Sequence, residues 1–166
     1  MGRFLAFVGF LLVVFYCLSN SSPRGELNRL VAGARGHAQY VQAMCAAHEK
    51  RVAEYNSAAQ AAALNGGRPP SVNRKLQVEA NEPTPSLAEL MKNCKDLYDR
   101  LKAKGDPDSL KLASACNDLY KFLSALDNME KNLNTDNIVG VASSYNSWVD
   151  QTNQRMKKLD ETLAKL

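Results

Sequence analysis

The chain has 166 residues, enough for one domain of ordinary size with one appended segment. Hydrophobic residues make up 45% of it, but 21 of them are alanine, and aromatic residues make up only 7%. Because β-sheets need valine, isoleucine and tyrosine at higher density, this composition argues against an all-β or doubly wound α/β fold. The net charge of +4 is too small to indicate binding to nucleic acid, and four cysteines are too few for a disulfide-dense scaffold.

Residues 1–22 are predicted to be an N-terminal membrane anchor or signal segment. An uninterrupted apolar run from Phe4 to Leu18 follows Arg3 and precedes small polar residues, which is typical of an export signal. We expect the segment to be retained as an anchor, because the run is rich in Phe and Val and lacks an Ala-x-Ala cleavage pattern. Its shortness favours the alternative of cleavage, since a helix of this length spans about 22 Å against a hydrocarbon core of about 30 Å.

Arg3 sets the predicted orientation. A basic residue on the short side of the apolar run keeps the N-terminus in the cytoplasm or matrix, so residues 23–166 are expected on the extracytoplasmic side (periplasm, lumen or intermembrane space). The chain is then a single-pass membrane protein that contacts the membrane through Phe4 to Leu18. If the segment is cleaved, it is a secreted protein instead.

The first segment after the anchor, residues 24–64, is predicted to be one very long helix. Apolar or small residues recur in steps of four and three over five heptads, as in a coiled-coil seam, and Asn65 and two glycines end the pattern. The helix would be about 60 Å long, and its alanine-rich seam lets partner helices approach closely. The seam residues are Leu27, Val31, Ala34, Ala38, Val41, Cys45, His48, Val52, Tyr55, Ala59 and Ala62.

Residues 65–85 are predicted to be a proline-rich surface connection, and residues 86–133 a helical hairpin. Ser86 and Glu89 have the spacing of a capping box, and Gly105 ends the first arm of the hairpin. Asp106, as N-cap, and Pro107, at the first helical position, begin the second arm at once. The turn is so short that the two arms have to be antiparallel.

A last helix is predicted over residues 135–166, where apolar residues again recur in steps of three and four. The predicted fold is therefore all-α. It comprises an N-terminal transmembrane or signal helix and an antiparallel bundle of about four helices, of which the first is very long.

Cys94 and Cys116 are predicted to form a disulfide. They lie eleven residues before and after Gly105, so the antiparallel arms bring them face to face, and export would place them in an oxidising compartment. Because a disulfide needs a closer approach than ordinary helix packing gives, two buried free thiols remain the alternative. Cys45 and Cys17 are expected to be free.

Residue types that carry chemistry are sparse. The two histidines, His37 and His48, lie on the same predicted helix, and Cys45 stands three residues before His48, a spacing that can share a metal. An alanine-rich seam also seats a buried cysteine and a hydrogen-bonded histidine, and we favour this structural interpretation. The sequence has no Glu-x-x-His pair, phosphate-binding glycine loop or Gly-x-Ser-x-Gly motif. We therefore expect no cofactor, no metal site and no enzymatic activity.

The sequence instead favours a non-catalytic interaction or structural subunit. We expect the membrane-anchored bundle to dock on other protein subunits, in a hetero- or homo-oligomer, and not on nucleic acid. The alternative is a secreted helical binding module released by signal cleavage. The candidate interface comprises the seam residues Ala38, Val41, Cys45, His48 and Val52 together with Tyr145 and Trp148 of the last helix.

Overall fold

The computed structural model describes residues 22–68, 76, 78–134 and 138–166. These residues form four helices and no strand: α2 (Pro23–Leu64), α3 (Leu87–Lys104), α4 (Pro107–Leu133) and α5 (Ile138–Leu163). The predicted all-α fold of four helices with a long first helix is confirmed. The predicted anchor helix at residues 4–18 lies outside the described residues, and within the described ranges no helix has the length and apolarity needed to span a membrane.

The ends of α3 and α4 follow local sequence signals. The Ser86 hydroxyl accepts a hydrogen bond from the Glu89 backbone N–H, and the Glu89 carboxylate accepts one from the Ser86 N–H, which confirms the capping box. Gly105 ends α3 in the left-handed conformation with φ 72°, which favours glycine. Asp106 then begins α4, and its carboxylate accepts from the Ser109 N–H at 2.9 Å.

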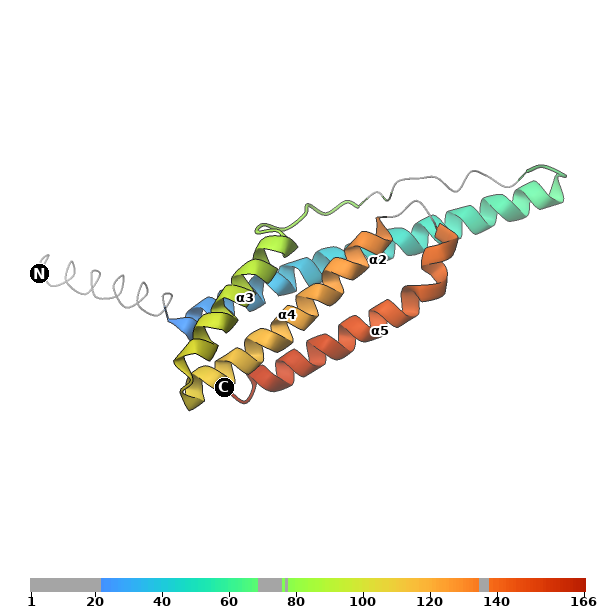
Figure 1. Ribbon diagram of the computed structural model, residues 1–166. Helices are drawn as coiled ribbons and strands as arrows, with labels where there is room; N and C mark the ends of the chain where they lie inside the picture. Colours follow the sequence, from blue (N-terminus) through green and yellow to red (C-terminus); the bar gives the residue numbers. More distant parts are fainter. Residues whose placement is uncertain (1–21, 69–75, 77, 135–137) are drawn as a thin grey trace, which may run out of the picture.

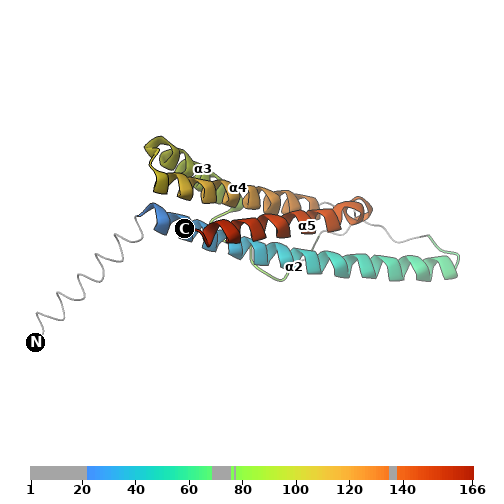
Figure 2. The same ribbon diagram turned by 90° about the horizontal axis from the view of Figure 1, so that it is seen from below.

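The four helices alternate in direction (Figure 1). α3 and α4 form an antiparallel hairpin, α2 packs across both of them, and α5 lies along α4 on the side away from α3. Figure 2 shows α5 running beside α2 along part of its length. Contacts at both ends of this pair set its direction, because Arg35 binds Asp160 and Glu49 binds Tyr145, so α2 and α5 are antiparallel.

The core is centred on α4, which contacts each of the other three helices. Its buried polar residue Asp118 accepts a hydrogen bond from the Thr162 hydroxyl at 2.9 Å and so joins α4 to α5. α2 passes close to α3 at Gly33, where a Cβ atom would lie 2.9 Å from Leu90 Cδ2. The largest fully buried side chains are Phe122, Leu27, Met44, Leu90, Leu97, Leu101, Leu119, Leu123, Leu126, Leu133, His37 and Val141.

The buried stripe on α2 is wider than the predicted seam. His37, Met44 and Arg51 are buried although they lie outside the seam. The reason is that α3, α4 and the connection that precedes α3 all lie against α2, so the helix buries two adjacent faces rather than one coiled-coil edge. The C-terminal end of α2 projects beyond the bundle in both views, and Leu64 is 87% exposed.

Candidate functional site

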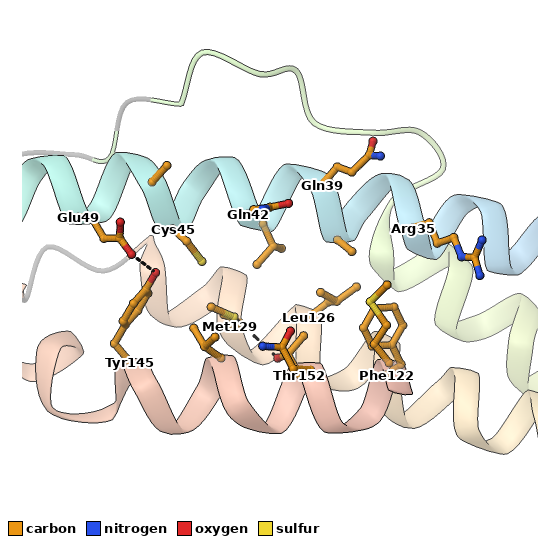
Figure 3. Close-up of a pocket in the computed structure, with 16 residues that line it drawn as sticks. Arg35, Gln39, Gln42, Cys45, Glu49, Phe122, Leu126, Met129, Tyr145 and Thr152 are labelled. Carbon is orange, nitrogen blue, oxygen red and sulfur yellow. Dashed lines mark hydrogen bonds between the residues drawn. The ribbon is translucent and has the colours of Figure 1, made fainter. Parts of the chain in front are cut away.

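A groove runs between α2 and α5, where the two helices separate above α4 (Figure 3). Its volume is about 640 Å³. It forms because α5 packs on α4 and α2 packs on α3 and α4, while α2 and α5 make little direct contact with each other. We call it the α2–α5 groove. Its lining residues are Arg35, Ala38, Gln39, Val41, Gln42, Cys45, Ala46, Glu49, Phe122, Leu126, Met129, Tyr145, Val149, Thr152, Asn153 and Met156.

The inner surface of the groove is mostly apolar. Its floor consists of Phe122, Leu126 and Met129 of α4, which lie between the two walls in Figure 3. The α2 wall carries the small side chains of the predicted seam, and the α5 wall carries Val149 and Met156, the latter 37% exposed. The three floor residues are at most 3% exposed, so the apolar surface that another molecule could cover lies mainly on the walls, where covering it is favourable.

A polar contact closes each end of the groove. At one end Arg35 Nη2 lies 3.1 Å from Asp160 Oδ1, with 58% and 47% of the two side chains exposed. At the other end the Tyr145 hydroxyl donates to Glu49 Oε1 at 3.0 Å. An exposed ion pair such as Arg35–Asp160 stabilises a fold by less than about 1 kcal/mol, so its charges remain available to another molecule.

The thiol and the phenol at the Glu49 end are held in their protonated forms. Burial raises the pKa of the Cys45 thiol, and burial together with the neighbouring Cys45 and Glu49 raises the pKa of the Tyr145 hydroxyl. A reactive cysteine needs a lowered pKa and a positively charged neighbour, and Cys45 has instead the Glu49 carboxylate close by. At neutral pH these groups therefore act as a neutral wall of the groove rather than as a nucleophile and a base.

His48 lies behind this wall and is 2% exposed. Its Nδ1 accepts a hydrogen bond from Arg51 Nη2 at 3.0 Å, which requires a neutral imidazole with its proton on Nε2. Its ring centroid lies 5.5 Å from that of Tyr145. Burial and the Arg51 guanidinium lower the pKa of His48 and so keep it neutral.

His37 faces a different part of the molecule. Its Nε2 lies 2.8 Å from the Pro85 carbonyl oxygen and donates to it, which ties the middle of α2 to the start of α3. The two histidines therefore do not share a site, although eleven residues bring them to nearly the same face of α2. The described residues contain no group of three His, Cys, Asp or Glu side chains placed to hold a metal ion.

The predicted interface residues are distributed over several places. Ala38, Val41, Cys45 and Tyr145 line the α2–α5 groove. His48 is buried behind it, while Val52 and Trp148 are half-buried and do not line it. The α4 floor and the charged ends of the groove were not among the predicted interface residues. The spacing of Arg35 and Glu49 along one edge of α2 is a sequence signal that points to the charged ends.

Cys94 and Cys116 lie at facing positions of the α3–α4 hairpin, and both are fully buried free thiols. The Cys94 thiol donates to the Cys116 carbonyl oxygen at 3.1 Å. Hydrogen bonding to the Cys116 side chain and burial raise the pKa of the Cys94 thiol. The hairpin therefore brings the two residues together, and the disulfide between them stays a prediction. Cys45 is free, and Cys17 lies outside the described residues.

Comparison with protein-family models, with curated proteins and with solved structures gives no match to this chain. The functional interpretation consequently rests on the groove and on the residues that surround it.

Proposed function

We propose that this chain is a non-catalytic, membrane-anchored interaction protein whose helical bundle docks on partner subunits through the α2–α5 groove. The observation that carries the proposal is the separation of α2 from α5, which leaves an apolar channel along two helices of an otherwise closely packed bundle. Helix faces from a partner covering this channel would extend the packing of the bundle, which is a common mode of recognition between helical proteins.

The protonation states at the groove support an interaction role. The neutral thiol of Cys45 and the neutral hydroxyl of Tyr145 add hydrogen-bonding and packing surface at one end. The charged groups stand at the two ends of the groove, and between them the apolar side chains of the floor and walls lie beside the amides of Gln42 and Asn153. A mixture of apolar and polar side chains is the usual composition of a protein–protein interface that is not permanent.

The membrane part of the proposal rests on the apolar run from Phe4 to Leu18. Retention of this segment would hold the bundle beside a membrane on its extracytoplasmic side. The mass of the intact protein isolated from its natural source tests this directly. The full mass supports the anchor, whereas the loss of about twenty N-terminal residues would make the protein a secreted binding module.

A second candidate is the binding of a small apolar molecule. The groove volume of about 640 Å³ falls within the range of about 300–1,000 Å³ that is usual for small-molecule sites, and this observation favours the candidate. Against it, the groove is partly open to solvent, whereas a small-molecule site normally encloses most of its ligand. We therefore rank docking of a protein first.

Photo-crosslinking in intact cells tests the proposed docking. A photoreactive amino acid replaces Asn153, an exposed residue of the groove, and in a matched control it replaces Ser124, an exposed residue of α4 that does not line the groove. We expect a discrete protein adduct from position 153 and none from position 124. Equal adducts from both positions, or none from either, would contradict docking through the groove.

A further inference from the structure

Five exposed residues form a ridge on α2 along the edge of the α2–α5 groove: Arg35, Gln39, Gln42, Ala46 and Glu49. Their spacing of four, three, four and three residues places all of them on one face of the helix. The rest of α2 at this level packs against α3, α4 and the connection that precedes α3. The ridge is therefore the side of α2 at which another chain has access.

The ridge is complementary to its own reversed copy. If two such ridges pair antiparallel about Gln42, Arg35 of each stands opposite Glu49 of the other. The long side chain of Gln39 then lies level with the small Ala46, and Gln42 faces itself, where two amides can exchange hydrogen bonds. Opposite charges, unequal sizes and a self-pairing amide therefore all match in one register.

α5 repeats the pattern at the same height. The contacts of Arg35 with Asp160 and of Glu49 with Tyr145 place Asn153 beside Gln42, halfway along the groove. Three residues before Asn153 is Asp150, and four residues after it is Lys157, and both of these are exposed. A two-fold axis through Gln42 and Asn153 would bring Asp150 of each copy close to Lys157 of the other.

We propose that the partner at the α2–α5 groove is a second copy of this chain. The two copies pair about a two-fold axis, with α2 antiparallel to α2 and α5 antiparallel to α5, so that the two grooves face each other. This inference rests on the proposed function, because it assigns the occupant of the same docking surface. Val149 of each copy then lies close to Met156 of the other on either side of the axis, and the two kinds of charge pair fix the register.

Charge reversal tests the register in the full chain, purified in mild detergent, with the dimer dissociation constant measured by sedimentation. By symmetry, Arg35→Glu or Glu49→Arg alone creates two like-charge pairs per dimer, and we expect each to weaken dimerisation by about tenfold or more. The double reversal should restore the constant to within about threefold of the unmodified chain. Lys92→Glu, on the exposed face of α3, is the matched control and should have no effect.

Restoration by the double reversal has only one structural explanation. Residues 35 and 49 are about 21 Å apart along one helix, so they pair only between two copies. Arg35→Glu also adds a second carboxylate beside Asp160 of its own chain, so the melting temperature of each variant is measured alongside. Glu49→Arg adds no like charge beside Asp160, although it removes the acceptor of the Tyr145 hydroxyl, and it has to give the same loss. Asp150→Lys with Lys157→Asp has to show the same rescue on α5.

Cysteine crosslinking tests the position of the axis. In a Cys17→Ala and Cys45→Ala background of the full chain, Gln42→Cys should oxidise to a covalent dimer, whereas Lys92→Cys should not. The inference would be overturned if the chain is monomeric at every concentration tested. It would also be overturned if the dimer dissociation constant is unchanged by the charge reversals and Gln42→Cys forms no covalent dimer. In that case, a photo-adduct from position 153 to a different protein would leave the proposed function standing, so the two failures are distinguishable.

Discussion

Replacing Gly33 or Gly36 by alanine tests how closely α2 and α3 pack. The two glycines lie three residues apart in the same helix, so each substitution gains the same helix propensity, about 1 kcal/mol. Their surroundings differ sharply. A Cβ at Gly33 would lie 2.9 Å from Cδ2 and 3.3 Å from Cδ1 of the buried Leu90, whereas at Gly36 the nearest atom, Pro83 Cβ, is 4.0 Å away.

The difference between the two variants isolates the packing cost, because the helix-propensity gain cancels. At Gly36 the new methyl group makes ordinary contacts, so Gly36→Ala should stabilise the fold by about 1 kcal/mol. At Gly33 it displaces a side chain held in a packed core, and overpacking of this kind costs about 1–3 kcal/mol. Gly33→Ala should therefore be less stable than Gly36→Ala by about 1–3 kcal/mol.

Urea denaturation followed by circular dichroism measures both free energies of unfolding. The cause is checked by repeating the comparison in a Leu90→Ala background, where the obstructing side chain is absent and the difference should fall below about 0.5 kcal/mol. If Gly33→Ala stabilises the fold as much as Gly36→Ala, the helices do not approach at Gly33 as described, and the reasoning is refuted.

Three further predictions concern the core, the pH dependence and the cysteines. Val41→Asp should lower the free energy of unfolding by several kcal/mol, because Val41 is 3% exposed and an aspartate there would be an unpaired buried charge. A change within about 0.5 kcal/mol would contradict the packing of α2. Burial and the Arg51 guanidinium lower the pKa of His48 below 6.5, so below this pH the unfolded chain binds more protons than the native one. The free energy of unfolding should therefore keep its full value above pH 6.5. It should fall as the pH drops below 6.5, by at most about 1.4 kcal/mol per pH unit. Urea titrations at pH 7.5 and 5.5 should show that His48→Gln removes part of this loss, and an unchanged difference would refute it. In protein isolated from an oxidising compartment, Cys94 and Cys116 should form a disulfide, which stabilises the hairpin by roughly 3 kcal/mol. Peptide mapping without reduction tests this. Finding both cysteines as free thiols would contradict the disulfide and weaken the extracytoplasmic placement.

Local signals in the sequence predict the elements of this fold well. The capping box at Ser86, the glycine stop at Gly105 and the aspartate cap at Asp106 each act within a few residues of chain, so they are readable without knowledge of the tertiary structure. The long first helix is readable for a related reason, since its heptad spacing extends over many turns.

The same local signals do not predict the α2–α5 groove. A seam of alanine and cysteine indicates that α2 packs against something, but not which helix covers each part of it. Ala38 and Cys45 have the spacing of core residues, yet they face the channel that α5 leaves open. His37 and Arg51 are buried although their residue types favour the surface, because the connection that precedes α3 lies beside them: His37 binds the Pro85 carbonyl oxygen, and Arg51 lines a pocket with Leu76 and Val78.

The mass of the native particle tests most directly whether the α2–α5 groove is a docking surface. The full chain is extracted in mild detergent from the cells that naturally produce it, and its particle mass is compared with that of two variants. Val149→Arg places a charge on the groove wall, and Ser124→Arg places the same charge on the exposed face of α4. We predict a particle larger than one chain for the unmodified protein and for Ser124→Arg, and a single chain for Val149→Arg. A single-chain mass for the unmodified protein, or an unchanged particle for Val149→Arg, would contradict the account.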